Sequence, residues 1–325
     1  MLAVYIPEIK KLRREEAPAA IPENPVWIDL LNPTKEEEVL VEHVLQVDLP
    51  TREEMKEIEI SSRLYKEDEA IFMTATLLSN STSELSEALP VTFVLAQHSL
   101  VTIRYSDPRS FQIFSARTQH IDGDYSSKEA ILTGLLESVM NRLADILENI
   151  ANDVNAVSQE IFKNKKENPP EDATDFQDIL QRIGQKGDLN SKVRESLVGL
   201  TRLLAFLEHS LSSSRTVSRE LKGRIATLSH DTHALTEHVS FLSNKINFLL
   251  DATLGMISIE QNTTIKIFSV AAVVFLPPTL VASVYGMNFE FMPELKWITG
   301  YPFALALMVL SAIVPYWYFK RRHWL

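Results

Sequence analysis

The chain of 325 residues contains no cysteine, so disulfide bonds and thiolate metal sites are excluded. It also lacks a phosphate-binding loop of the GxxxxGK[ST] type, which argues against a nucleotide-driven process. The N-terminal stretch MLAVYIPEIKK has no basic region followed by an apolar run, so we expect no signal peptide. No Ser/His/Asp order, carboxylate pair or redox motif stands out, and an enzyme is therefore the weakest interpretation.

Charge is missing from two runs near the C-terminus, 267–289 and 297–319, each 23 residues long. A helix needs about 20 residues, at about 1.5 Å each, to cross a hydrocarbon core about 30 Å thick. The runs therefore predict two membrane-spanning helices joined by a short external loop at 286–299. Lys266 precedes the first run and a basic tail follows the second, so the positive-inside rule predicts that both termini are cytoplasmic.

The net charge of −11 is unevenly distributed along the chain. Residues 267–325 contain four basic and two acidic side chains, a net charge of +2, so the first 266 residues carry −13. This acidic part argues against nucleic acid as a partner and is typical of a surface that handles cations. Solubility explains the same charge equally well.

Residues 1–125 alternate between strand-like and helix-like segments and predict a small α/β domain in the cytosol. Strands are expected over 26–30, 70–79, 89–97 and 100–106, the last two joined by a short turn. Thr34 and Glu37 form a capping box that predicts a helix to about Gln46, and Thr51 with Glu54 repeats the pattern.

Residues 126–266 have a helical pattern almost without interruption. Apolar residues recur at steps of three and four within 127–165 and predict one buried stripe. Its members are Ile131, Leu135, Val139, Leu143, Ile146 and Ile150. Asn168-Pro169-Pro170 ends this helix, and a second is expected over about 173–211, with Gly184 and Gly187 as weak points and a serine-rich break at 212–214.

A long helix is then expected to begin near Asp231, which can serve as its N-cap. It meets no proline before Pro277 and reaches Tyr285, a length of 55 residues or about 80 Å. Only part of that length fits in a bilayer, so about 50 Å should extend into the cytosol. Such a helix needs the preceding helices or copies of itself to bury its apolar stripe.

The first predicted span carries a line of mostly small, apolar or weakly polar side chains. The line consists of Asn262, Ile265, Phe268, Ala272, Leu276, Thr279, Ser283 and Gly286. If identical helices surround an axis, Asn262 and Thr279 offer rings of neutral oxygens, with an apolar stretch between them where water can be expelled to close a pore. Small residues at this spacing also suit close helix packing, so both interpretations stay open. Pro277-Pro278 should bend the helix.

The stretches IEQNTTIKIF, FLPPTLVASVYGMNFEFMPELKW and YFKRRHWL, which cover about the last 65 residues, resemble the CorA family of magnesium transporters, especially its bacterial branch. The resemblance rests on Tyr285-Gly286-Met287-Asn288, the Met-Pro-Glu-Leu loop and the basic Trp-Leu end, in this order and spacing. It implies an α+β membrane protein that forms a homopentameric funnel in the bacterial inner membrane. It implies three parts: an α/β/α domain (1–125), a helical region with an antiparallel helix pair and a stalk helix (126–266), and two spans with a cytosolic tail (267–325).

The resemblance also implies that the Gly-Met-Asn loop selects the ion, so Tyr285, Gly286, Met287 and Asn288 are the expected filter residues. Mg²⁺ loses its waters reluctantly, and the Asn288 amide oxygens can accept hydrogen bonds from those waters. Glu290 and Glu294 should concentrate cations nearby without trapping them. Met287 should pack beneath the loop, and Gly286 should permit positive φ and close approach of the backbone.

The resemblance also implies that cytosolic Mg²⁺ bound between neighbouring subunits keeps the pore closed. The segment His230–His238 is one place for such a site, with Asp231 as the expected ligand; His233 and Glu237 share a helical face. Imidazoles suit Zn²⁺, Co²⁺ or Ni²⁺ better than Mg²⁺, and an ordinary solvated face explains the segment equally well. The tail residues Lys320, Arg321 and Arg322 are expected as a membrane anchor and, in a pentamer, as a cytosolic cationic collar.

The expected function is passive, potential-driven uptake of Mg²⁺, and also of Co²⁺ and Ni²⁺, without an organic cofactor. A potential of 100 mV is worth about 4.6 kcal/mol for a divalent ion. A zinc-transporting relative of the same architecture is the first alternative, although the Met-Pro-Glu-Leu loop favours magnesium. A non-conducting membrane-anchored sensor or scaffold is the alternative from another class.

Overall fold

The computed structural model describes residues 1–18, 20–67, 69–79, 86–162, 176–212, 217–288 and 292–322. Its internal contacts define two compact units, Met1–Leu250 and Asp251–Leu325. The finer division at residues 125 and 266 stays a prediction. The first unit contains the whole β-sheet, and the second contains the two apolar runs.

The first unit is built on a seven-stranded sheet with the order β2-β1-β3-β7-β6-β5-β4. Its strands are β1 Leu2–Glu8, β2 Lys11–Glu16, β3 Trp27–Leu31, β4 Leu64–Glu67, β5 Ala70–Ser79, β6 Glu87–Ala96 and β7 Ser99–Arg104. β3 and β7 pair in parallel, and the other pairings are antiparallel. The four predicted strands are confirmed as β3, β5, β6 and β7, with β5 matching its predicted range.

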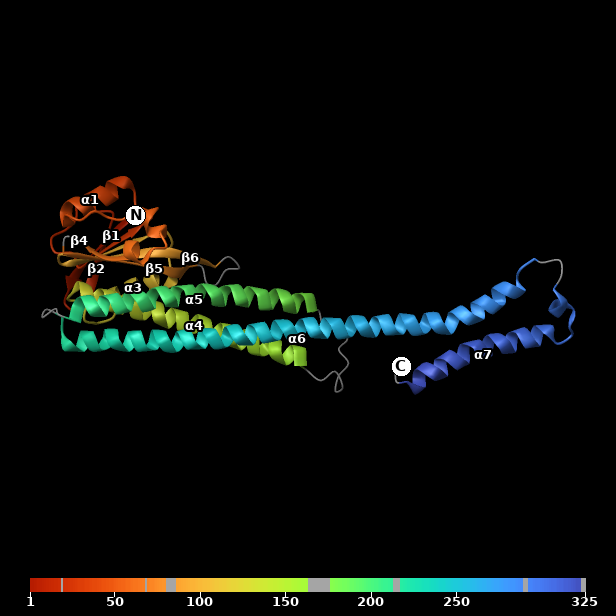
Figure 1. The fold of residues 1–325 in the computed structure, drawn as a ribbon. Coiled ribbons are helices and arrows are strands. Elements are labelled where there is room, and N and C mark those ends of the chain that lie inside the picture. Colours follow the sequence, from red (N-terminus) through yellow and green to blue (C-terminus); the bar gives the residue numbers. More distant parts are fainter. Residues whose placement is uncertain are drawn as a thin grey trace. The chain divides into compact units, whose positions relative to one another are not determined.

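Helices cover both faces of this sheet, which gives the expected α/β/α arrangement (Figure 1). One face carries α1 Lys35–Leu45, the 3-10 turn Glu54–Lys56 and the short α2 Ile60–Arg63. Val41, Leu45 and Met55 pack there in a buried cluster with strand residues. On the other face lie α3 Arg109–His120 and parts of α4 and α5.

The capping box at Thr34 is confirmed. Thr34 Oγ1 accepts from Glu37 N at 3.3 Å, and Glu37 Oε2 accepts from Thr34 N at 2.9 Å. The repeated pattern at Thr51 and Glu54 is confirmed by the same pair of bonds, although the element that follows is a three-residue 3-10 turn and not an α-helix. A cap cannot extend a helix that has no apolar face to bury, and Ile58 is 87% exposed just beyond the turn.

Long helices follow the sheet: α4 Lys128–Phe162, α5 Phe176–Ser212, α6 Arg219–Tyr285 and α7 Gly300–Arg321. The whole predicted stripe on α4 is buried. The breaks predicted at 168–170, 213 and 214 lie outside the described residues, while Ser212 is the last residue of α5. α5 runs through Gly184 and Gly187 without interruption, which corrects the expected weak points: a helical glycine costs about 1 kcal/mol, less than the buried leucines of α5 gain.

α6 begins at Arg219 and not near Asp231, so the predicted start is wrong and the helix has 67 residues instead of 55. Ser218 Oγ accepts from Leu221 N at 3.1 Å at this end. The buried residues Leu221, Ile225 and Leu228 continue the apolar stripe upstream of Asp231, which explains the earlier start.

Within the first unit, α6 packs against the two preceding helices, as its apolar stripe requires. Arg224 of α6 forms a two-pronged ion pair with Glu137 of α4, both contacts at 2.9 Å. Asn190 of α5, 1% exposed, donates to Ser243 Oγ of α6 at 2.8 Å. These polar contacts fix the register of helices that apolar packing alone leaves free to slide.

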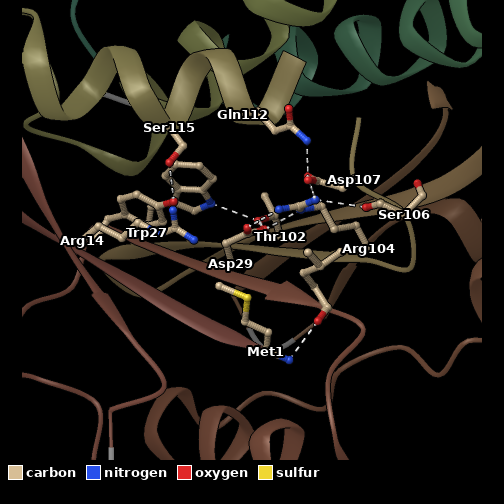
Figure 2. A network of polar contacts seen from close by, with 12 residues as sticks. Met1, Arg14, Trp27, Asp29, Thr102, Arg104, Ser106, Asp107, Gln112 and Ser115 are labelled. Carbon is tan, nitrogen blue, oxygen red and sulfur yellow. Dashed lines mark hydrogen bonds and ion pairs between the residues drawn. The ribbon is translucent and has the colours of Figure 1, made fainter. Parts of the chain in front are cut away.

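A buried polar network joins the two parallel strands β3 and β7 (Figure 2). Arg104 on β7 donates to both carboxylate oxygens of Asp29 on β3, at 3.0 and 2.8 Å, and Thr102 donates to Asp29 Oδ1 at 2.6 Å. Burial lowers the pKa of Arg104, but the hydrogen bonds and charge of Asp29 outweigh burial and raise the pKa above its usual value. The paired charges hold this part of the sheet in one register.

Candidate ion pathway

The predicted line of pathway residues lies on α6, in the second unit. Asn262, Ile265, Phe268, Ala272, Leu276, Thr279, Ser283 and Gly286 are all exposed in the single chain. Phe268 is 71% exposed and Leu276 is 66% exposed. Apolar side chains left open over such a length have to be covered by lipid or by other copies of the helix.

One face of α6 is hollowed into an open groove of about 370 Å³. Four residues of the predicted line, Ala272, Leu276, Thr279 and Ser283, line it together with Phe275 and Leu280. Phe275 and Leu280 were not predicted, because stepping by three and four follows one row of side chains and omits the adjacent rows.

Two prolines lie inside α6 beside this groove, at Pro277 and Pro278. Figure 1 shows that α6 bends near its C-terminal end, in the part that contains them, as the sequence predicts. Thr279 Oγ1 donates to the carbonyl oxygen of Phe275 at 2.7 Å. The hydroxyl hydrogen is used within the helix, so the Thr279 oxygen faces outward as a hydrogen-bond acceptor.

The Gly-Met-Asn triplet follows directly after α6 ends at Tyr285. Gly286 N donates to Ala282 O at 2.9 Å and Met287 N donates to Val284 O at 3.3 Å, so the turn continues the end of the helix. Gly286 does not have the positive φ that we expected, because this extra turn keeps it in a helix-like conformation. The backbone does approach closely: a Cβ there would lie 3.2 Å from Ala282 O, tighter than an ordinary van der Waals contact.

The side chain of Asn288 is exposed at the end of this turn, and Met287 is 47% exposed in the single chain. Glu290 lies outside the described residues. Glu294 belongs to the 3-10 turn Pro293–Lys296, which leads into α7. The packing of Met287 beneath the loop and the attraction of cations by the two glutamates stay predictions.

α7 carries exposed aromatic side chains at both ends. Trp297 and Tyr301 lie at or before its first turn, and Trp317 and Tyr318 lie near its last turn, all more than half exposed. Aromatic rings in these positions are typical of the two membrane–water interfaces. α6 and α7 are the two described helices that are long and apolar enough to cross a membrane. Lys320 and Arg321 end α7, and Arg322 is its C-cap.

The segment His230–His238 lies within α6, and its charged and imidazole side chains are exposed. Among the described residues, no group of three or more histidine and acidic side chains in one chain can hold a metal ion. Asp231 lines an open groove of about 670 Å³ between α4 and α6, together with Glu137, Glu220 and Asn141. The carboxylate of Glu137 is already paired with Arg224, and the role of Asp231 as a regulatory ligand stays a prediction.

The stalk part of α6 has exposed aromatic residues that the sequence reading did not select. Phe241 is 59% exposed and Phe248 is 60% exposed. They lie seven residues apart, the spacing of a helix seam that meets other helices, and that signal was present in the sequence.

Together, these features define a class: a membrane protein with two spanning helices and an α/β/α domain whose last helix continues into the first span. The family model described as CorA-like Mg2+ transporter protein matches residues 22–321. The chain therefore belongs to the CorA-like Mg²⁺ transporter family, whose members are transporters and channels and not enzymes.

Two curated relatives are each described as magnesium transport protein CorA. The Escherichia coli (strain K12) protein is 36% identical over 326 residues, covering 100% of both chains. The protein of Sodalis glossinidius is 38% identical over 303 residues, covering 92% of both chains. The complete structure of the CorA magnesium transporter from Methanocaldococcus jannaschii matches with a TM-score of 0.77 at 17% identity, covering 100% of this chain and 99% of that one.

Proposed function

We propose that this chain forms a homopentamer in the bacterial inner membrane that takes up Mg²⁺ passively, and also passes Co²⁺ and Ni²⁺. The observation that carries the proposal is the exposed line of neutral and apolar side chains on α6, which ends at Gly286-Met287-Asn288. Curated relatives described as magnesium transport proteins support magnesium as the substrate. Both termini then lie in the cytoplasm and the triplet lies outside.

Five first spans surround the pathway in this proposal, with the groove lined by Ala272, Leu276, Thr279 and Ser283 turned toward the axis. The small side chains of Ala272, Thr279 and Ser283 leave room for an ion that keeps its waters, which Mg²⁺ gives up reluctantly. Five Asn288 amides accept hydrogen bonds from those waters at the outer end. Neutral oxygens bind more weakly than carboxylates, and weak binding permits release into the pathway.

The apolar part of the line forms the barrier when the pathway is closed. Phe268 and Leu276 project large apolar side chains from the helix, and both are more than 60% exposed. Rings of such side chains expel water from a narrow pore and so block a hydrated ion. A small outward movement of the helices lets water return.

The membrane potential supplies the driving force. An inside-negative potential of 100 mV is worth about 4.6 kcal/mol for a divalent ion, so no nucleotide is needed. Internal Mg²⁺ bound between subunits, with Asp231 as one ligand, stabilises the closed state. Loss of that ion shifts the population toward the open state.

A zinc-transporting relative of the same architecture is the alternative substrate assignment. The loop after the triplet reads Met292-Pro293-Glu294-Leu295, the form that resembles the magnesium branch. A non-conducting sensor or scaffold is the alternative from another class.

Purified protein in liposomes that contain a Mg²⁺-sensitive dye tests the proposal directly. We expect influx that rises with an inside-negative potential and stops in Asn288→Ala, while the mass of the detergent-solubilised assembly stays that of five chains. Parallel assays with a zinc dye distinguish the zinc alternative. Absence of any ion flux through wild-type protein under an imposed potential supports the scaffold interpretation instead.

A further inference from the structure

The C-terminal end of α7 carries three consecutive cations beside exposed aromatic rings. The guanidinium of Arg321 lies 5.3 Å from the ring centre of Trp317, and that of Arg322 lies 5.7 Å from the ring centre of Tyr318. Both distances are within the range of cation–π contacts. The rings are exposed by 59% and 54%, so each pair is open to the surroundings of the helix.

These cations have no carboxylate partner in the described part of the chain, where every recorded ion pair lies in the first unit. They also lie at a helix C-terminus, where free carbonyl groups favour positive charge. Arg322 N donates to two of these carbonyls, those of Tyr318 and Phe319, both at 3.2 Å. These bonds fix the backbone of Arg322 at the end of α7.

The position of the cluster identifies the anion. The aromatic rings beneath Arg321 and Arg322 are the type that lies at the headgroup level of a bilayer. Arginine forms two parallel hydrogen bonds with a phosphate group. A zwitterionic headgroup also contains a phosphate, but its own cationic group partly neutralises the charge of that phosphate. A net negative phospholipid is therefore the ligand whose charge matches this cluster.

We propose that Arg321 and Arg322, each supported by an aromatic ring, bind the headgroups of anionic phospholipids at the cytoplasmic end of α7. The inference rests on the membrane placement of α7 in the proposed function. It adds a lipid site to a tail that otherwise serves only as an orientation signal or as a collar near the pathway.

The chain contains a matched control site at the opposite end of α7. Trp297 is 58% exposed, nearly the same as Trp317, but Lys296 is the one cation beside it. Two reporter proteins separate the ends: Trp297→Phe with Trp324→Phe leaves Trp317 as the reporter, and Trp317→Phe with Trp324→Phe leaves Trp297. Trp27 stays in both, since it is 0% exposed in the first unit and is out of reach of lipid.

The experiment reconstitutes each full-length reporter in phosphatidylcholine vesicles with a fixed fraction of brominated phosphatidylglycerol or brominated phosphatidylcholine, and measures quenching of tryptophan fluorescence. Each cation near an anionic surface gains about 1 kcal/mol, so we expect a preference of about thirtyfold for phosphatidylglycerol at Trp317, beside two arginines, and of about fivefold at Trp297, beside one lysine. Arg321→Gln with Arg322→Gln should reduce the preference at Trp317 to about that at Trp297, because Lys320 remains; Lys266 and Lys320 still orient the spans.

Equal quenching by the two lipids at Trp317 overturns the inference but leaves α7 in the membrane. An undiminished preference in the double glutamine variant also overturns it, because the arginines are then not the ligands. Quenching by neither lipid overturns both this inference and the membrane placement. Failure of the proposed transport gives a different result: Trp317 is quenched, which places α7 in the membrane, but the dye reports no Mg²⁺ influx into the same vesicles.

Discussion

Gly286 and Ala282 make a close backbone contact at the end of α6, where a Cβ on residue 286 would fit tightly. Gly286 N donates to Ala282 O at 2.9 Å, and a Cβ on Gly286 would lie 3.2 Å from the same oxygen. The contact closes the end of α6 and fixes where Met287 and Asn288 begin. The position of Asn288, the proposed filter residue, therefore depends on a helix end where a side chain on residue 286 would fit tightly.

Gly286→Ala should lower Mg²⁺ influx by about tenfold, which is about 1.4 kcal/mol, because the final turn must move to admit the methyl group. Dye-loaded liposomes measure the change. Gly184→Ala on α5 is the matched control: a Cβ there meets nothing within 4 Å, so flux should stay at the wild-type level. Stability should rise in this control by about 0.5 to 1 kcal/mol. Equal flux in Gly286→Ala and wild type would show that the turn is not under this constraint.

Asn288→Asp tests why the mouth has an amide and not an acid. A ring of carboxylates should hold a divalent ion more strongly, so both the Mg²⁺ concentration at half-maximal influx and the maximal influx should fall, each by several-fold. Asn149→Asp makes the same exchange on α4, far from the pathway in sequence, and should leave both values unchanged. A rise in maximal influx for Asn288→Asp would argue that binding, and not release, limits transport.

Leu276→Ser tests the apolar barrier. A hydroxyl in place of a side chain that is 66% exposed on the pathway line should let water into the closed pore, and influx at high internal Mg²⁺ should rise by about tenfold. Leu310→Ser on α7 is the matched control, since Leu310 is 57% exposed but lies outside the predicted line. If both variants leak equally, the effect reflects damaged packing of the spans.

Glu37 gives a pH-dependent test of the fold. Burial raises the pKa of Glu37, but its hydrogen bonds to the N-terminal ammonium, Thr34 N and Leu2 N outweigh burial and lower the pKa below its usual value. A lowered folded-state pKa stabilises the protein above the unfolded-state pKa, and this contribution is lost as the pH falls through the folded-state pKa.

Glu37→Gln should therefore reduce the free energy of unfolding by about 1 kcal/mol at pH 7 and by progressively less below about pH 4.5. Thermal unfolding of the detergent-solubilised protein from pH 7 down to pH 3.5 measures the difference. Glu54→Gln is the control, because Glu54 caps a turn in the same way but does not bind the ammonium. If Glu37→Gln lowers the free energy of unfolding by the same amount at every pH, the charge of the Glu37 carboxylate does not contribute to stability.

Sequence reasoning predicted the helices and strands that have a clear hydrophobic pattern in their own residues. The 3-4 stripe from Ile131 to Ile150 is buried on α4, the run 70–79 forms β5, and the two charge-free runs form the apolar helices. It missed β1, since its first four residues are all buried and show no alternation, and β2, since its sequence KLRREE is a charged edge strand. Both are defined by pairing with distant strands and not by local pattern.

The row of predicted pathway residues stays a prediction, because a single chain cannot show which residues face a pore. The spacing from Asn262 to Gly286 gave the residues of one helical row, but the single chain leaves this row exposed and does not close a pore around it. The conformation of Gly286 was predicted wrongly because glycine suits both a positive φ and a tight helix end, and sequence does not distinguish them. Closure between copies depends on contacts that no single chain contains.

Asp231→Ala tests the regulatory part of the proposal. Asp231 is exposed on α6 at the edge of the groove that Glu137 and Glu220 also line, so it can reach a metal shared with a neighbouring subunit. Loss of one carboxylate ligand should raise the internal Mg²⁺ concentration that halves influx by about tenfold, since an interaction with a charged group is worth about 1.5 kcal/mol.

Dye-loaded liposomes with internal Mg²⁺ set between micromolar and tens of millimolar give the inhibition curve for each protein. Glu237→Ala is the control, because it removes an acid of the same exposed segment that does not line the groove. Its curve should match that of the wild type. If Asp231→Ala is inhibited like the wild type while Glu237→Ala is not, the regulatory ligand lies nearer to His233, and the metal is then one that favours imidazole, such as Zn²⁺ or Ni²⁺.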